Sequence, residues 1–120
     1  MLTRIGWVKN LKKVITYHEQ KVDRGIAERI HAGNFLLKPD ELTEALIYKR
    51  FDHALSCRAD GSLLVLHADV NFHPDDAPRL TTDTIRHITI QYMEGIGLSN
   101  QPYVAYRHID AAHPHCHIIA

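Results

Sequence analysis

Two strand-like segments near the end of the chain, residues 102–110 and 115–120, constrain the fold more than any other feature of the sequence. Only four residues, 111–114, connect them. A connection this short joins antiparallel strands, whereas parallel strands need a crossover of about a dozen residues or more. The sequence therefore predicts an antiparallel hairpin at this end of the chain.

Hydrophobic spacing predicts the other elements of the chain. In order, these are a strand over residues 3–9, a helix over 11–26, a helix from Pro39 to the turn at 60–61, a strand over 62–72, a helix from Thr81 or Thr82 to residues 95–97, and the two hairpin strands. Strands interleaved with helices and ending in a hairpin predict an α+β fold. We expect an antiparallel or mixed sheet packed on helices in a two-layer sandwich.

The strand over residues 62–72 carries different side chains on its two faces. One face is apolar throughout, while the other becomes polar halfway along, at His67, Asp69 and Asn71. We expect these three polar residues to extend the floor of a functional site.

The composition fits one cytoplasmic domain. The chain has 120 residues, enough for a single core, and its 14 basic and 14 acidic side chains leave no net charge to attract nucleic acid. There is no secretory signal and no apolar run near the roughly 18 residues that span a bilayer, so we expect a reduced, cytoplasmic protein without membrane insertion. Because the last apolar run ends without a polar tail, we expect residues 1–120 to be the N-terminal part of a longer protein.

Histidine is the most unusual part of the composition, with ten histidines in 120 residues and five of them between His87 and His117. Every second residue of a strand shares a face, so His108 and Asp110 lie together on one hairpin strand, as do His115 and His117 on the next. The simplest register pairs Asp110 with His115 and His108 with His117. It brings three imidazoles and one carboxylate to neighbouring positions about 5 Å apart.

Three imidazoles with an open remaining position are typical of a catalytic metal. We therefore predict that His108, His115 and His117 bind one divalent ion. Asp110 is expected to orient a ligand imidazole or to bind the ion itself. Cys116 points to the other face and is expected to pack as a small hydrophobic residue. The alternative explanation is a solvated sheet face that happens to be rich in histidine.

The run from His108 to His117, with the pattern His-x-Asp-x-x-His-Pro-His-x-His, resembles the third motif of the plasmid mobilisation relaxases. These enzymes belong to a wider group that is named for a histidine-hydrophobic-histidine (HUH) metal motif, here at residues 115–117. Residues 17–22 look like the matching N-terminal motif, and residues 102–107 are also similar to mobilisation relaxases. The resemblance spans nearly the whole chain.

The resemblance implies a relaxase fold and a DNA-nicking activity. Such relaxases cut one strand at a plasmid or transposon transfer origin, keep the 5′ end as a phosphotyrosine and later rejoin it. They use a divalent ion held by three histidines, which we expect here to be Mg²⁺ or Mn²⁺, with Zn²⁺ or Ni²⁺ as alternatives. The implied partners are single-stranded DNA and accessory relaxosome and coupling proteins. Tyr17 matches the nucleophile, and we place Asp110 with it in the catalytic group.

The helical position of Tyr17 suits this role. On an ideal helix Tyr17 lies about 130° from the centre of the apolar side, so it is not an obvious core residue. Lys13 and Lys21 flank it one turn away on either side, and Arg24 follows on the same face. These cations can offset the charge of a phosphodiester and favour the phenolate, so we expect all three to contact DNA. The alternative is an ordinary amphipathic helix with a solvated outer face.

Several neighbours of the predicted site have more than one interpretation. Tyr106 shares a strand face with His108, so it is an alternative nucleophile or a residue that stacks on a DNA base. Arg107 is a candidate phosphate contact. His18 falls near the apolar side of its helix and is expected to be a satisfied, partly buried histidine. His67 is a minor candidate for a metal ligand.

Two other functions fit the same residues. One is a metal-dependent phosphodiesterase in which metal-activated water, and not a tyrosine, attacks the phosphate. The other is a non-catalytic nucleic-acid-binding module in which the histidines hold a structural ion or none. Zero net charge is the best sequence argument for this binding module.

Overall fold

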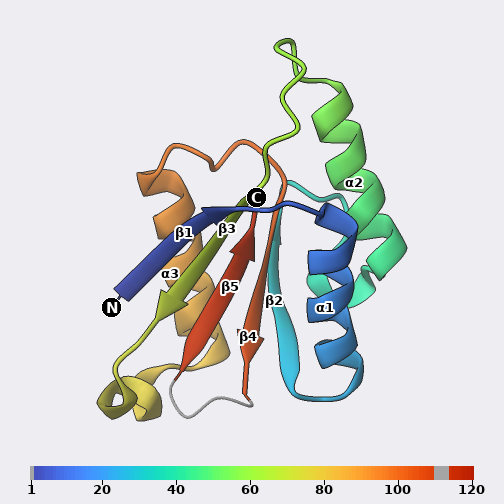
Figure 1. Ribbon diagram of the computed structural model, residues 1–120. Helices are drawn as coiled ribbons and strands as arrows, with labels where there is room; N and C mark the ends of the chain where they lie inside the picture. Colours follow the sequence, from blue (N-terminus) through green and yellow to red (C-terminus); the bar gives the residue numbers. More distant parts are fainter. Residues whose placement is uncertain (1, 110–113) are drawn as a thin grey trace.

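A five-stranded antiparallel sheet forms the centre of the computed structural model, which describes residues 2–109 and 114–120 (Figure 1). The strand order is β1-β3-β5-β4-β2. The elements are β1 (Leu2–Trp7), α1 (Leu11–Asp23), β2 (Ala27–Gly33), the 3-10 turn η1 (Pro39–Glu41), α2 (Glu44–Ser56), β3 (Leu66–Asn71), the 3-10 turn η2 (Pro74–Arg79), α3 (Thr82–Gly95), β4 (Tyr103–His108) and β5 (His115–Ile119). The predicted α+β class and the antiparallel sheet are confirmed. Within the described ranges, no helix has the length and apolar character needed to cross a bilayer.

Helices cover both faces of the sheet. On one face, Ile15 of α1 and Phe51 of α2 form an apolar cluster with Val104 of β4. On the other face, Ile85 of α3 clusters with Cys116 of β5, which is buried as predicted. The sheet therefore lies between two helix layers, whereas the sequence predicted a two-layer arrangement. The difference arises because the central strands carry apolar side chains on both faces.

Helix α1 begins and ends at local signals in the sequence. The side chain of Asn10 caps its start by accepting a hydrogen bond from the backbone N–H of Lys13 at 3.0 Å. The helix ends at Asp23, and Gly25 then adopts a φ of +76°, which turns the chain into β2. The predicted helix, which extended to residue 26, was therefore slightly too long. Strand β2 was not predicted, because its polar residues interrupt the strand pattern.

Strand β3 has the predicted division between its faces. Ala68 and Val70 point into the apolar cluster under α3. The alternate residues of β3, His67 and Asp69, lie on the opposite face and are half-buried. Because β5 pairs with β3 through His117 opposite Asp69, the polar residues of both strands meet on this face.

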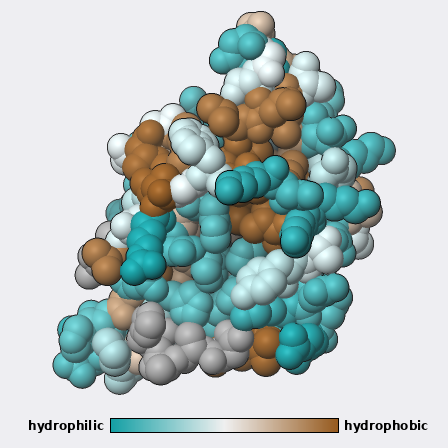
Figure 2. All heavy atoms as spheres, viewed as in Figure 1, coloured by the Kyte–Doolittle hydropathy of each residue, from teal (hydrophilic) through white to brown (hydrophobic). Residues whose placement is uncertain are grey.

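The face that carries these polar residues is only partly covered by helices. Helices α1 and α2 cluster with β4 residues, whereas β1 is an edge strand whose Leu2, Ile5 and Trp7 side chains are exposed. Figure 2 shows a largely hydrophilic surface across the middle of this face, bordered by hydrophobic patches. Polar side chains of the sheet are therefore accessible beside α1.

Candidate metal centre

The C-terminal hairpin forms as predicted, but in a different register. β4 and β5 pair antiparallel with His108 opposite His115 and Tyr106 opposite His117. The prediction paired His108 with His117, which is a shift of two residues. A shift of two residues keeps every side chain on its face, so the three predicted ligand histidines still lie together.

His108, His115 and His117 form a group that we call the outer triad. One ring nitrogen from each lies within 4.8 Å of the others, which is the spacing of a possible ion site. Ring centroids are 4.3 Å apart for His108 and His117, and 4.9 Å apart for His115 and His117. His108 is buried and the other two are half-buried. Asp110, which was expected to orient a ligand imidazole or to bind the ion, lies outside the described residues.

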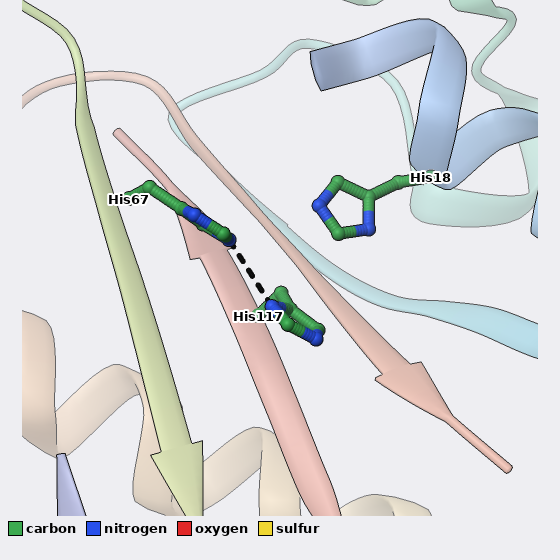
Figure 3. A group of neighbouring side chains, drawn as sticks. All are labelled: His18, His67 and His117. Atoms are coloured by element: carbon green, nitrogen blue, oxygen red, sulfur yellow. Dashed lines mark hydrogen bonds between the residues drawn. The ribbon is translucent and has the colours of Figure 1, made fainter. Parts of the chain in front are cut away.

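A second group of histidines adjoins the first and shares His117 with it. His18 of α1 and His67 of β3 point toward His117, as Figure 3 shows, and we call these three residues the inner triad. Nε2 of His67 lies 3.1 Å from Nδ1 of His117. Nδ1 of His18 and Nε2 of His108 are 2.9 Å apart and share a hydrogen bond. The two triads are therefore one continuous cluster of five imidazoles.

Two polar atoms of this cluster are buried without a hydrogen bond. In residues 2–109 and 114–120, Nε2 of His18 and Oδ1 of Asp69 are the two side-chain atoms in this state. Oδ1 of Asp69 is 2.6 Å from Nδ1 of His117 and 3.2 Å from Nε2 of His67. Leaving such atoms unsatisfied costs free energy, and a bound cation would satisfy both.

Only part of this inner group was predictable from the sequence. His18 was expected to be a satisfied histidine, but it is only 1% exposed and has one unpaired nitrogen. The alternation of apolar and polar residues along β3 did predict His67 and Asp69 as part of the floor of the site. The position of α1 over the sheet, which brings in His18, depends on tertiary packing that periodicity does not report.

Burial keeps the central imidazoles neutral. Burial, together with the neighbouring His117 and His108, lowers the pKa of His18 to about 2. Burial also lowers the pKa of His117 to about 4, against the opposing effect of the Asp69 carboxylate. Metal ligation requires neutral imidazole. These side chains are therefore in the protonation state that binds an ion at neutral pH, so the donor set fits a divalent metal.

A buried polar network lies next to the histidines. The hydroxyl of Tyr106 donates to Oε2 of Glu19 at 2.6 Å, and the guanidinium of Arg29 donates to both carboxylate oxygens of Glu19. The ring of His18 stacks on that of Tyr106, with centroids 4.9 Å apart and an interplanar angle of 11°. Glu19 follows His18 directly in α1, so this network fixes the part of the helix that carries His18.

The position of Tyr106 corrects its expected role. Its side chain is fully buried, and burial together with the Glu19 carboxylate raises the pKa of Tyr106 far above its usual value. A ring in this position can neither stack on a DNA base nor attack a phosphate. Strand parity placed Tyr106 on the correct face, but it could not show that α1 covers that residue.

Tyr17 lies at the exposed edge of the histidine cluster. Its side chain is 51% exposed, and its ring centroid is 5.1 Å from that of His18 and 6.3 Å from that of His108. Nζ of Lys21 sits 5.1 Å from the centre of the Tyr17 ring, in a cation–π contact. The phenol is therefore accessible to a ligand that reaches the histidines.

A groove of about 530 Å³ runs beside Tyr17. It is lined by Trp7, Val8, Lys9, Asn10, Lys13, Val14, Tyr17 and His67. The described residues that line it include two lysines and no acidic side chain. The groove therefore offers positive charge and aromatic surface next to the inner triad.

Two other residues that were predicted to contact DNA, Arg24 and Arg107, do not line this groove. Arg24 is exposed at the C-terminal cap of α1. Arg107 alternates with Tyr106 and His108 on β4, so its side chain is on the face of α3, where its Nη1 donates to Oγ1 of Thr82 at 3.5 Å. Arg107 therefore lies on the sheet face opposite the histidines, and its contact with a DNA phosphate stays a prediction.

Comparison with known proteins identifies the family. Residues 17–120 match the family described as relaxase, MobA/VirD2-like, nuclease domain. The match covers most of the chain, and the chain belongs to this family. Membership implies a DNA-nicking enzyme with DNA as its substrate. Neither the curated proteins nor the solved structures gave a match to this chain.

Proposed function

We propose that this chain nicks and rejoins one DNA strand at a transfer origin through a phosphotyrosine on Tyr17. The observation that carries the proposal is the position of Tyr17, an exposed phenol at the edge of a buried histidine cluster. An attacking tyrosine must reach the phosphate that the site holds, and this arrangement lets both groups contact one phosphodiester. Plasmid or transposon mobilisation is the process that needs such a reaction.

The outer triad is the proposed position of the catalytic ion. His108, His115 and His117 supply three imidazoles, and a fourth position stays open for a phosphate oxygen. When bound, a divalent ion there polarises a non-bridging oxygen of the scissile phosphate. Imidazole ligands suit Zn²⁺ and Ni²⁺, whereas Mg²⁺ and Mn²⁺ are bound mainly through oxygen ligands. Because the open position would take a phosphate oxygen, Mn²⁺ and Mg²⁺ are the first ions to test, with Zn²⁺ and Ni²⁺ as alternatives.

The groove beside Tyr17 is the proposed path of the single strand. Lys9 and Lys13 can each contact a backbone phosphate, and the exposed indole of Trp7 offers a surface for a base. Lys21, above the Tyr17 ring, can offset the charge of the phosphate under attack. Arg24 extends the same basic face toward the end of α1. Local charge of this kind acts even where the net charge is zero.

The proposed cleavage step is a transesterification at phosphorus. The Tyr17 hydroxyl oxygen forms a bond to phosphorus as the bond from phosphorus to the 3′ oxygen breaks. The phenol proton passes to solvent, and the released 3′ oxygen takes up a proton. Because a phosphodiester bond is exchanged for another, the reverse reaction joins a 3′-hydroxyl strand without a nucleotide cofactor.

Single-stranded DNA from the replicon that encodes the protein tests this function. The full chain is incubated with labelled DNA and Mn²⁺, and products are separated under denaturing conditions. The proposal predicts a labelled protein–DNA adduct that carries the 5′ end. Free 5′-phosphate ends without an adduct would favour a phosphodiesterase that uses water. Binding without cleavage under all these conditions would favour a non-catalytic DNA-binding module.

His115→Ala and His87→Ala form a matched pair for the same assay. His115 belongs to the outer triad, whereas His87 is an exposed residue of α3, on the other side of the sheet. Removing one ligand of three is expected to lower the affinity of the outer triad for Mn²⁺ at least about tenfold and to lower nicking at limiting Mn²⁺. His87→Ala is expected to nick as the parent does. Equal nicking by both variants would contradict a role for the outer triad.

A further inference from the structure

The inner triad shares only His117 with the outer triad, and it has the geometry of a metal site of its own. Nε2 of His67 and Nδ1 of His117 are 3.1 Å apart, close to the roughly 3.3 Å that separates two nitrogens on one tetrahedral ion. Oδ1 of Asp69 lies 2.6 Å and 3.2 Å from these same two nitrogens. One nitrogen of His18 lies within 4.8 Å of a nitrogen of His67 and of a nitrogen of His117.

The buried unpaired atoms point to a ligand at this place. Nε2 of His18 belongs to a side chain that is 1% exposed and is directed from α1 toward the strands (Figure 3). When Nδ1 of His18 donates its hydrogen to Nε2 of His108, 2.9 Å away, the lone pair on Nε2 of His18 remains available. Oδ1 of Asp69 is the other buried atom without a hydrogen bond among the described side chains. A cation between them would satisfy both atoms.

We propose that His18, His67, His117 and Asp69 form a second, closed position for a single zinc-class divalent ion. Three imidazoles and one carboxylate fill a tetrahedral shell, so no position stays open for a phosphate oxygen. This ligand set suits Zn²⁺, whereas Mg²⁺ prefers an octahedral shell of oxygens. An ion held here is therefore stored or structural, and it cannot polarise the substrate.

The two positions exclude one another because they share His117. A neutral imidazole has one lone pair, so His117 can bind one ion at a time. Two divalent cations at neighbouring positions would also repel strongly, and Asp69 is the carboxylate that contacts the described cluster. Zinc in the inner position consequently removes a ligand from the outer triad. Zinc binding can be measured without DNA, so a failure of the inner position is distinguishable from a failure of the proposed nicking function.

Zinc binding by four forms of the full chain tests the second position. The forms are the parent, His115→Ala, His67→Ala and the double variant, and their zinc content and affinity are measured by equilibrium dialysis with Zn²⁺ alone. His115 and His67 are both half-buried, which makes them a matched pair. We expect one ion per chain in the parent and in each single variant. The double variant is expected to bind at least tenfold more weakly than either single variant.

Other results would overturn the inference. Loss of zinc in His115→Ala alone would show that the inner residues hold no ion, and two ions in the parent would contradict mutual exclusion. Retention in His115→Ala with loss in His67→Ala would keep the inner position but contradict the outer triad of the proposed function. Unchanged zinc affinity in the double variant would place the ligands elsewhere.

Bound Co²⁺ gives a second readout that does not depend on affinity. Four-coordinate Co²⁺ absorbs visible light far more strongly than six-coordinate Co²⁺. His115→Ala is expected to show the intense four-coordinate spectrum, and adding Asp69→Asn is expected to change it because the carboxylate ligand is lost. An identical spectrum with and without Asp69→Asn would contradict the closed site. Far-ultraviolet circular dichroism checks that each variant is folded.

Discussion

His117 is the residue on which both histidine groups depend. It lies opposite Tyr106 and Asp69 in the sheet, contacts Asp69 directly and belongs to both triads. Burial lowers its pKa to about 4, and that of His18 to about 2. Because these pKa values are lower than that of an unfolded histidine, the folded protein binds fewer protons than the unfolded chain at mildly acidic pH.

Stability should therefore fall as the pH is lowered in the metal-free protein. An unfolded histidine binds a proton below a pKa of about 6.5. His117 in the folded chain does so only near pH 4. Unfolding then takes up a proton between these values, so stability is complete above about pH 6.5 and decreases below it, by at most about 1.4 kcal/mol per pH unit for each such group. Urea unfolding in the presence of a chelator measures this dependence.

Replacement of His117 should flatten that dependence. His117→Gln removes one of the groups that titrate differently in the two states, whereas His87→Ala removes an exposed histidine. The free energy of unfolding of His117→Gln should change less between pH 6.5 and pH 4 than that of the parent. His87→Ala is expected to keep the pH dependence of the parent. If the free energy of unfolding of His117→Gln also depends on pH as strongly as that of the parent, burial does not hold His117 neutral.

The lysines on the tyrosine face should set the salt dependence of DNA binding. Each phosphate contact on a single strand contributes about 0.7 to the slope of log affinity against log salt concentration. Lys13 lines the groove and Lys21 contacts the Tyr17 ring. The double variant with Lys13→Ala and Lys21→Ala should reduce the magnitude of this slope by about 1.4.

Fluorescence anisotropy with a labelled single strand at several salt concentrations gives that slope. Lys49→Ala, an exposed lysine of α2, is the control and should leave the slope unchanged. If both the double variant and the control keep the slope of the parent, the DNA does not follow the groove beside Tyr17.

At the scale of elements, α1 is held on the sheet by the contact between Glu19, Arg29 and Tyr106. The side chains of Glu19 and Arg29 are only 5% and 11% exposed, so their charges depend on each other. Tyr106→Phe removes one hydrogen bond to Glu19 and should lower the free energy of unfolding by about 1–3 kcal/mol. Glu19→Gln leaves the guanidinium of Arg29 without its carboxylate and should cost more, about 3–5 kcal/mol.

Chemical denaturation of these variants measures the two costs. Tyr103→Phe is the control, because Tyr103 is buried in the other core cluster, under α3. It should be less destabilising than Tyr106→Phe. An order in which Glu19→Gln costs less than Tyr106→Phe would contradict the view that the ion pair anchors α1.

Elements with a clear local signal were predictable from the sequence. The short connection predicted the hairpin, Asn10 precedes α1 as its cap, and Thr81 caps α3 by accepting from the backbone N–H of Thr84 at 3.1 Å. Strand β2 was missed because Arg29 and its polar neighbours serve tertiary contacts that strand periodicity does not report. The hairpin register was wrong by two residues, since spacing alone does not show where pairing stops.

At the scale of the molecule, the site is assembled from elements far apart in the sequence. The three outer histidines were predictable because a two-residue period fixes their common face. His18 was not, because its role depends on how α1 lies across the sheet. The exposure of Tyr17 was anticipated from helical geometry, whereas the burial of Tyr106 required the position of α1. The local basic groove likewise could not be read from a net charge of zero.

Tyr17 is the proposed nucleophile of a DNA-nicking reaction beside the histidine cluster. Tyr17→Phe keeps the aromatic ring but removes the attacking oxygen, so it should retain metal and single-stranded DNA affinity and form no covalent adduct. Tyr48→Phe, at a partly exposed tyrosine of α2, is the control and should form the adduct as the parent does.

Mass spectrometric mapping of the trapped adduct is the most direct measurement. The full chain is reacted with single-stranded DNA and Mn²⁺, digested with protease and nuclease, and searched for a nucleotide-modified peptide. We expect the nucleotide on the peptide that contains Tyr17, attached through its 5′ phosphate. A nucleotide on another tyrosine, or an adduct that persists in Tyr17→Phe, would contradict this expectation.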